Sequence, residues 1–403
     1  MEKIAKARSI AATYVTEAFE WACEHNFATA IWRLPKQKQL KTIIDFSENI
    51  SLEKLDVETA QTGFVFSPFL NKIENAEGLK LIKAYFIKAM SIFDENLKDL
   101  PDEKLAKDEP EKNLLAYLKN FRKRTELSLP KVQLSQNNSE SHIRLVEKAV
   151  KAIKKGDFQK IVISRKQTVC FEHTNWSVTD VVKKLAELYP DALISAVFIP
   201  NVGLWIGASP EILVSLDKNQ IFRTMALAGT QVLPPQTPLS EVFWTQKEIE
   251  EQALVSRYII NAFKKIRLRE FEEEGPRTVQ AGNLVHLRTD FWVDLKEVAY
   301  PNLLGVMLAL LHPTSAVCGM PKEESLQFLA EHEGYDRSFY SGFLGQINFD
   351  KETQIFVNLR CMEILSKTEA FLYAGGGITE NSKPQKEWQE TIAKMQTILK
   401  AFD

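Results

Sequence analysis

The chain has 403 residues, 45% of them hydrophobic, and 51 basic against 53 acidic residues. This is enough to bury a large core, whereas a net charge of −2 gives no basic surface for nucleic acid. Four scattered cysteines without a Cys-x-x-Cys pair exclude a zinc ribbon and indicate reduced thiols. The longest apolar run, 303–311, is about half of a membrane span. We therefore expect a cytoplasmic protein without membrane or nucleic-acid partners.

The first third of the chain has weak patterns. Residues 1–30 favour a helix, and residues 95–130 are dense in charge, which is typical of a surface excursion and not of a core. A polar stretch, Gln133–Ser141, then resembles a linker. We expect a single domain of residues 1–403 in which residues 1–138 form an irregular N-terminal part.

From residue 139 the elements are easier to predict. Ser139 or Ser141 caps a helix that Gly156 ends, and Ser177 caps a second helix. Longer helices follow at about 240–266 and after Ser382. Strands are predicted at Lys160–Val169, Leu193–Ile199, Leu204–Ile206, Ile212–Leu216, Ile221–Leu227, around Val279, and at Leu284–Val293, Ile355–Ile364 and Phe371–Tyr373. Runs of strands interrupted by single helices predict an α+β fold with large, mostly antiparallel sheets.

The last helix carries a possible metal-binding face. Glu387, Glu390 and Lys394 stand at positions i, i+3 and i+7, and therefore share one side of the helix. Two carboxylates one turn apart supply hard oxygen ligands for Mg²⁺, and the lysine can hold a substrate anion. A solvated, salt-bridged face would have the same spacing. The same two interpretations apply to the charged residues of the long helix, Lys247, Glu248, Glu250 and Glu251.

A glycine run, Gly375–Gly377, follows a predicted strand and precedes this acidic helix. Glycines there allow backbone N–H groups to approach an anion closely, although a tight turn would need them equally. Lys160 and Glu211 stand at strand edges, where isolated charged residues are most often exposed. A lysine that acts as a base needs a pKa far below its usual value of about 10.4.

Two further polar residues fall within predicted strands. Arg360 lies mid-strand between apolar residues, and a buried arginine there needs a carboxylate unless the strand faces a cleft. His286 is also mid-strand, where a hydrogen-bonded core histidine is the commoner case. Neither position is decisive by itself.

Together and in this order, the motifs resemble those of the chorismate-utilising enzymes, which include isochorismate, salicylate, anthranilate and aminodeoxychorismate synthases. The resemblance covers residues 139–403. It rests on Lys160–Arg165, Gly207–Glu211, Leu227–Thr230, Leu311–Thr314, Tyr335–Gly342 and Ala374–Ile378 with Glu387–Thr391. It implies one α+β domain of two packed, mostly antiparallel sheets with outer helices, as in anthranilate synthase component I. The active site would lie in a cleft between the sheets.

The resemblance also implies roles for individual residues. Lys160 would be the general base that deprotonates the water attacking C2 of chorismate, and Glu211 the general acid that protonates the leaving C4 hydroxyl. Glu251 and Glu390 would bind Mg²⁺, with Glu387 behind them or bound to the ion through a water molecule, and the ion would hold the ring carboxylate. The substrate-binding positions would be Gly229, Thr230, His286, Ala316, Tyr340, Arg360, Gly375, Gly377 and Lys394.

Two alanines favour one branch of this family. Aminodeoxychorismate synthases resemble one another in carrying a lysine at the position of Ala228, and the salicylate and anthranilate synthases carry threonine at that of Ala316. The chain therefore looks most like an isochorismate synthase, with a lyase of the same family or a non-catalytic chorismate-binding protein as alternatives. Gln252 departs from the histidine common after the metal-binding glutamate. We expect a monomer, and leave both menaquinone and siderophore synthesis open as the pathway served.

Overall fold

The computed structural model describes residues 2–70, 72–74, 80–95, 100–121, 127–135, 139–233, 237–281 and 284–403. Within these ranges the strands form two sheets of ten strands each. Neighbouring strands run antiparallel throughout the central part of both sheets. The α+β fold with large antiparallel sheets is thus confirmed.

The first sheet has the order β16-β9-β20-β19-β11-β10-β1-β2-β7, with β8 beside β9. Its strands are β1 (Ala28–Arg33), β2 (Lys41–Asp45), β7 (Ser91–Asp94), β8 (Val132–Leu134), β9 (Lys160–Phe171), β10 (Leu193–Ile199), β11 (Gly203–Ser209), β16 (Gly319–Met320), β19 (Cys361–Ile364) and β20 (Glu369–Ile378).

The second sheet has the order β14-β15-β13-β12-β18-β17-β4-β6-β3, with β5 beside β6. Its strands are β3 (Glu53–Lys54), β4 (Gly63–Ser67), β5 (Lys72–Glu74), β6 (Lys80–Lys88), β12 (Ile212–Leu216), β13 (Ile221–Val232), β14 (Glu272–Ala281), β15 (Leu284–Asp294), β17 (Phe343–Phe349) and β18 (Glu352–Val357).

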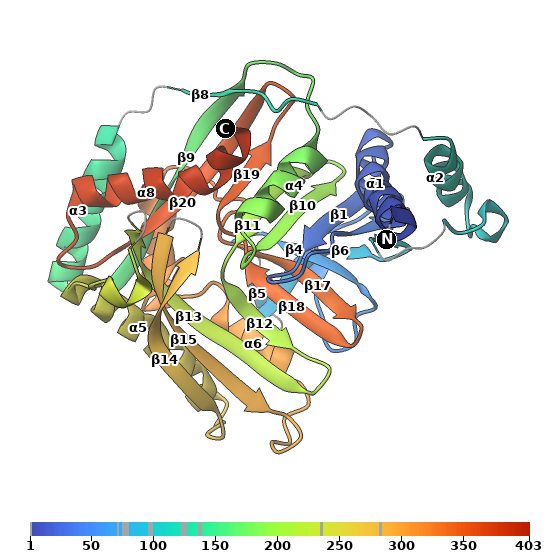
Figure 1. The fold of residues 1–403 in the computed structure, drawn as a ribbon. Coiled ribbons are helices and arrows are strands. Elements are labelled where there is room, and N and C mark those ends of the chain that lie inside the picture. The colour runs from blue at the N-terminus through green and yellow to red at the C-terminus, as the bar shows by residue number, and fades with distance from the viewer. Residues whose placement is uncertain are drawn as a thin grey trace.

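Helices cover the outer faces of both sheets (Figure 1). Those against the first sheet include α4 and α8, and those against the second include α5 and α6. The helices are α1 (Glu2–Glu24), α2 (Glu109–Asn120), α3 (Ser139–Lys155), α4 (Val178–Leu188), α5 (Gln246–Lys265), α6 (Leu303–Leu311), α7 (Lys322–His332) and α8 (Pro384–Leu399), with 3-10 turns η1 (Glu103–Leu105), η2 (Leu239–Glu241) and η3 (Lys400–Phe402).

The strand pattern explains how the sheets pack. Successive side chains of a strand point to opposite faces, and in β1 Ala30 and Trp32 belong to one buried cluster while Ile31 belongs to another. The cluster of Trp32 also contains Phe64 and Phe66 of β4, which lies in the second sheet. Both faces of β1 are therefore buried, one against the other sheet and one against helices.

The N-terminal part differs from the irregular segment that we expected. Residues 28–94 supply strands to both sheets, and Trp32 Nε1 donates a hydrogen bond to Gln346 Oε1 of β17 at 3.1 Å. Strand-forming residues were present, but short strands separated by turns give little periodicity. In the charged region 95–130, α2 buries Leu114, Leu115 and Leu118 in the core, so this region is more than a surface excursion. Residues 96–99, 122–126 and 136–138 lie outside the described residues.

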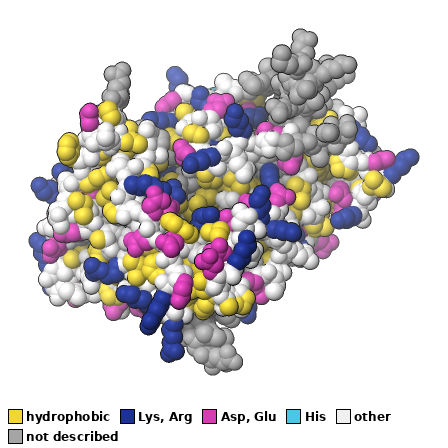
Figure 2. Space-filling view, turned by 60° about the horizontal axis from the view of Figure 1, so that its bottom comes forward, with side chains coloured by type: hydrophobic (Ala, Val, Ile, Leu, Met, Phe, Trp, Pro, Cys, Tyr) yellow, Lys and Arg dark blue, Asp and Glu magenta, His cyan; other side chains and the backbone are white. Residues whose placement is uncertain are grey.

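Charges on the surface are mixed. On the face shown in Figure 2, lysine and arginine side chains alternate with aspartate and glutamate instead of separating into large patches. In the described part of the chain, no helix is both long and apolar enough to cross a bilayer. The charged residues inside the fold are therefore more informative about function than the distribution of charge on this face of the surface.

Candidate active site

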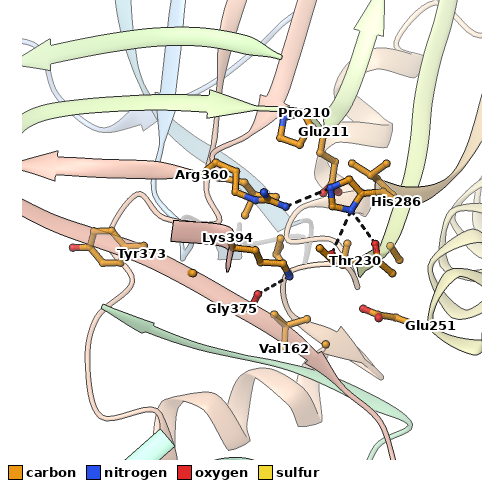
Figure 3. A pocket seen from close by; sticks show the side chains of 18 of the residues that line it. Val162, Pro210, Glu211, Thr230, Glu251, His286, Arg360, Tyr373, Gly375 and Lys394 are labelled. Carbon is orange, nitrogen blue, oxygen red and sulfur yellow. Dashed lines mark hydrogen bonds between the residues drawn. The ribbon is translucent and has the colours of Figure 1, made fainter. Parts of the chain in front are cut away.

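A pocket of about 610 Å³ opens where residues of the two sheets meet. Figure 3 shows Arg360, Glu211 and His286 on one side of it and Gly375 and Val162 on the other. The structure brings nearly all predicted site residues to its wall, namely Glu211, Gly229, Thr230, Glu251, His286, Ala316, Tyr340, Arg360, Gly375, Gly377 and Lys394. The other three predicted residues, Lys160, Glu387 and Glu390, lie next to this wall, as their contacts below show.

The three glycines lie within β20 instead of in a loop after it, and Gly375 and Gly377 line the pocket. Gly375 and Gly377 pair with Ser164 and Val162 of β9. A Cβ atom on Gly377 would overlap the carboxylate of Glu251, and one on Gly376 would lie 3.2 Å from Glu387 Oε2. The glycines are thus needed for close approach of carboxylates to the sheet, and not for an anion-binding turn.

Lys160 is the first residue of β9 and is fully buried. Its Nζ lies 2.9 Å from Glu251 Oε1, so the predicted base is paired with a predicted metal ligand. Burial alone would raise the pKa of Glu251, but the positive charges of Lys160 and Lys247 outweigh it and lower that pKa. This ion pair connects β9 with α5 across the edge of the pocket.

Glu211 follows Pro210 in the turn between β11 and β12, as predicted, and only 4% of it is exposed. Burial raises the pKa of its carboxyl group to about 8, although Lys160, Lys394 and Arg360 oppose the shift. The carboxyl group is therefore protonated at neutral pH. It is a proton donor that faces a pocket lined by basic groups.

His286 lies in β15, and its hydrogen bonds define its protonation state. Nδ1 lies 2.9 Å from the carbonyl oxygen of Gly229 and 3.3 Å from Thr230 Oγ1. Burial and the charge of Arg360 lower the pKa of His286 to about 3, so the ring is neutral. Because Nδ1 must donate to the carbonyl oxygen, Nε2 is the acceptor, and it faces Arg360 Nη2 at 3.5 Å.

Arg360 departs from its predicted mid-strand position. The strand is interrupted between β18 and β19, and Arg360 in this interruption adopts a left-handed φ of 50°. The prediction of a single strand over residues 355–364 is therefore wrong. In a continuous strand the side chain of residue 360 would point to one face of the sheet, whereas the left-handed backbone turns it into the pocket. Its Nη1 donates to Thr397 Oγ1 at 3.1 Å, and no carboxylate of the described residues forms an ion pair with it. The guanidinium is available for an anionic ligand.

Aromatic rings close the side of the pocket near Gly375. Tyr340 stacks on Tyr373 with ring centroids 5.5 Å apart, and both residues line the pocket. Burial raises the pKa of the Tyr340 hydroxyl above its usual value, so this group remains a neutral donor. Tyr373 was not among the predicted site residues, although its position two residues before Gly375 marked it as a neighbour.

The acidic face of α8 is directed at the sheet, and it is not a solvated face. Glu387 Oε1 lies 2.6 Å from Lys247 Nζ of α5, and Glu390 Oε1 lies 2.7 Å from Lys394 Nζ. Lys394 also donates to the carbonyl oxygen of Gly375 at 2.8 Å (Figure 3). Burial and the neighbouring Glu390 raise the pKa of Glu387 to about 7. The negative charges of the two carboxylates therefore repel each other at a position where little water screens them.

These carboxylates are suitable ligands for a divalent cation. Glu387 Oε2 is buried and accepts no hydrogen bond within the described structure, which leaves a hard oxygen donor without a partner beside a second carboxylate. Among the described residues no three acidic, histidine or cysteine side chains already surround one point. Instead Glu251, Glu387 and Glu390 are each neutralised by a lysine. A bound cation would take over this neutralisation.

The structure also separates the charged residues of α5. Lys247 and Glu251 face α8 and the pocket, whereas Glu248 caps the helix by accepting from Thr245 N, and Glu250 accepts from Gln246 near solvent. Lys247 was named with the other charged residues of this helix, but it was not predicted as a site residue. Its spacing of four residues from Glu251 places both on one helix face and was the signal that could have identified it.

Comparison with known proteins agrees with this site. The family model described as chorismate binding enzyme matches residues 83–403. The vibriobactin-specific isochorismate synthase of Vibrio cholerae is 29% identical over 250 residues, which cover 60% of this chain and 61% of that protein. The match thus spans about three-fifths of the length of this curated relative.

Two solved structures have the same fold. That of MenF, the menaquinone-specific isochorismate synthase from Escherichia coli, superposes with a TM-score of 0.70 at 21% identity over 94% of this chain and 89% of MenF. That of anthranilate synthase component I from Streptococcus pneumoniae gives 0.64 at 18% identity over 93% and 92%. The predicted two-sheet architecture is confirmed. Because the family model covers most of the chain, including every residue of the pocket, this protein belongs to the chorismate-binding enzymes.

Proposed function

We propose that this protein is an isochorismate synthase, which converts chorismate to isochorismate with Mg²⁺. The observation that carries the proposal is a buried Glu211, whose pKa burial raises to about 8, in the same pocket as an arginine without a carboxylate partner. A site of this kind combines a proton donor with a binding group for a carboxylate. Chorismate has two carboxylates and a hydroxyl leaving group, so it matches both features.

The reaction is an allylic displacement that needs one acid and one base. Water attacks ring carbon C2, the double bonds shift, and the C4 hydroxyl leaves as water, so that the product is an isomer of the substrate. In our proposal Lys160 removes the proton from the attacking water, and Glu211 supplies the proton to the leaving hydroxyl. For this Lys160 must first lose the proton with which it pairs with Glu251 at 2.9 Å in the structure, so that its neutral amine can accept the proton of the water.

The remaining wall of the pocket would orient the substrate. Arg360 and Tyr340 would bind the enolpyruvyl carboxylate, the first through two parallel N–H donors and the second through its neutral hydroxyl. His286 supports this arrangement because its neutral ring accepts from the guanidinium and adds no charge. Gly375 and Gly377 would allow the ring of the substrate to lie close to β20.

Glu251 and Glu390, with Glu387 behind them, would hold Mg²⁺, which supplies charge neutralisation for the ring carboxylate and orients it. Lys160, Lys247 and Lys394 would then exchange their present partners for solvent or substrate. The unpartnered Oε2 of Glu387 supports this assignment. Lys394, already 2.8 Å from the carbonyl oxygen of Gly375, stays at the pocket wall in either state.

Ala316 and Ala228 favour water attack without later elimination of pyruvate. Both line the pocket, where their small side chains leave space for a water molecule. The lyase alternative would need an additional group that promotes elimination, and the non-catalytic alternative gives no reason for a protonated Glu211. The relatives include a vibriobactin-specific and a menaquinone-specific isochorismate synthase, so neither menaquinone nor siderophore synthesis is assigned.

The proposal is tested by incubating the purified protein with chorismate, in the presence of Mg²⁺ or of EDTA, and separating the products by chromatography. We expect Mg²⁺-dependent isochorismate that approaches an equilibrium with chorismate, and no pyruvate. Pyruvate together with salicylate would contradict the assignment in favour of a lyase. Binding of chorismate without turnover would favour a non-catalytic protein. Light scattering on the same sample tests the expected monomer.

A further inference from the structure

Behind the pocket lies a buried ion pair that has no role in the mechanism above. Arg337 Nε lies 2.6 Å from Glu333 Oε2 and Arg337 Nη2 lies 2.7 Å from Glu333 Oε1, which is a bidentate arrangement. The exposed fractions of the two side chains are 2% and 3%. Burying two charges costs free energy unless further hydrogen bonds compensate for the lost water. The other hydrogen bonds of this pair therefore indicate its role.

The remaining hydrogen bonds of the pair all go to two chain segments. Arg337 Nη1 donates to the carbonyl oxygen of Val317, and Nη2 donates to that of Val162, each at 2.7 Å. Glu333 Oε1 accepts from the backbone N–H of Ser164 at 2.8 Å and from its hydroxyl at 2.7 Å. The pair therefore joins β9 to the segment 316–318.

Both segments are part of the pocket wall. Val162 and Val317 line the pocket, and so does Ala316, the neighbour of Val317. The N–H of Val162 also donates to the carbonyl oxygen of Cys318 at 2.8 Å, so the segments touch directly and the ion pair spans this junction. Lys160 lies two residues before Val162 on β9. The ion pair is thus one of the contacts that set the position of Lys160 relative to Ala316, together with the backbone pairing of β9 with β16.

We propose that Glu333 and Arg337 are positioning residues for the reaction, which together fix the distance between Lys160 and the wall at Ala316. This inference rests on the proposed function, in which the attacking water lies between the base and that wall. A guanidinium can bind two carbonyl oxygens and a carboxylate at once because its donors point in fixed, divergent directions. A lysine at the same place keeps the charge but cannot hold all three acceptors in the same geometry.

The experiment compares Arg337→Lys and Glu333→Gln with Arg144→Lys as a matched control. Arg144 pairs with Glu140 across four residues of α3, as Arg337 does with Glu333, but both side chains are exposed. Two readouts are measured. Hydrogen–deuterium exchange of the Val162, Ser164 and Cys318 amides does not depend on any activity, and kcat and KM for chorismate report on the reaction.

We expect faster exchange at these three amides and a loss in kcat of up to about 100-fold, since displacing reacting groups by about 1 Å can cost this much. KM should change by less than threefold, because Arg360 and the metal-binding glutamates are left intact. Arg144→Lys should leave both readouts unchanged. A purely structural role would lower the melting temperature and the amount of active enzyme without changing the kcat of the folded fraction.

Unchanged exchange in Arg337→Lys would overturn the proposal, and so would faster exchange with normal kcat. If Arg337→Lys fails to fold, the charge-free double variant Glu333→Leu with Arg337→Met takes its place, since apolar replacement of a buried pair is often neutral for stability. A wild-type protein that leaves chorismate unchanged would count against the proposed function. The exchange measurement would still decide whether the pair fixes the two segments.

Discussion

Nζ of the fully buried Lys160 and Oε1 of Glu251 in the pocket wall form an ion pair at 2.9 Å, so the proposed base and a proposed metal ligand neutralise each other in the structure. Glu251 cannot keep this partner unchanged and also give its charge to a cation. In the proposed site, binding of Mg²⁺ would therefore be linked to release of the lysine. This link can be measured through stability and binding, without requiring turnover.

Mg²⁺ should stabilise the wild-type protein, because a ligand that binds only the folded state raises the free energy of unfolding. At a concentration 100-fold above Kd the gain is about 2.7 kcal/mol. Glu251→Gln should lose most of it, as measured by calorimetric titration and thermal unfolding with and without Mg²⁺. Glu250→Gln, one residue away on α5 and bonded to Gln246, is the control. Equal stabilisation of Glu251→Gln and wild type would argue against the metal assignment.

Replacing the proposed proton donor should stop turnover without unfolding the protein. Glu211→Gln keeps the shape of a side chain that is neutral at pH 7, but it removes the proton that the leaving hydroxyl needs. We expect kcat to fall by about 10²- to 10⁴-fold, with an unchanged melting temperature at neutral pH. Product chromatography measures the rate, and Glu172→Gln at an exposed position is the control. Normal activity in Glu211→Gln would remove this residue from the mechanism.

The pKa of Glu211 also predicts a dependence of stability on pH. Its folded pKa of about 8 lies above the ordinary 4.5, so between these values the folded protein holds a proton that the unfolded chain releases. Its contribution is complete below pH 4.5 and is lost as the pH rises through 8. The melting temperature should therefore fall less steeply from pH 5 to 8 in Glu211→Gln than in wild type. Parallel curves would contradict the raised pKa.

His286 acts in the opposite direction at lower pH. Its folded pKa of about 3 lies below the ordinary 6.5, so the unfolded chain takes up a proton that the folded protein does not. Stability from this residue is lost as the pH falls from 6.5 towards 3. In His286→Gln, urea unfolding at pH 4.5 and 7 should give a smaller difference than in wild type. If the difference in unfolding free energy between the two pH values is the same in both proteins, His286 takes up a proton in the folded protein as readily as in the unfolded chain.

Arg360→Lys should weaken substrate binding more than it weakens catalysis. A lysine retains the charge but loses the parallel donors that bind a carboxylate. Because hydrogen bonds to charged groups contribute about 1.5–3 kcal/mol, KM should rise about 10- to 100-fold. Steady-state kinetics with chorismate provide the measurement, and Arg144→Lys on the surface is the control. An unchanged KM would place the enolpyruvyl carboxylate elsewhere.

Ala316→Thr tests what separates this branch from the lyases. Threonine would fill part of the space beside Val317 and bring a hydroxyl into the pocket wall. We expect pyruvate release to become detectable, with salicylate as the second product, in a coupled assay for pyruvate. If no pyruvate forms while isochorismate formation continues, Ala316 marks the subfamily without determining the outcome.

Sequence patterns predicted the elements that carry strong local signals. The helix at Ser139–Lys155 has its apolar spacing and terminal glycine, and the site residues of α8 share one face, as their spacing required. Segments whose order depends on distant partners were not predictable in this way. β1 and β4 form strands of the two sheets because Trp32, Phe64 and Phe66 pack against residues hundreds of positions away, and no local periodicity indicates this.

Two details of the site were also beyond sequence patterns. The turn of Arg360 out of the strand depends on its left-handed backbone and on Thr397, which lies in α8. The glycine run is read equally well as a turn or as a strand until β9 and Glu251 are placed beside it. Which helix faces which is a tertiary property. The resemblance to a family identified the candidate site residues, and the structure shows which contacts place them in the pocket.

The pocket is built from residues that extend from Val162 to Lys394 and come from both sheets. Its formation therefore requires contacts of large sequence separation, which form slowly because the chain must lose much entropy before they contribute. During refolding, strand content should return before the ability to bind a ligand does. Binding would then be a marker of completed assembly of the two sheets, more demanding than any spectroscopic signal of secondary structure.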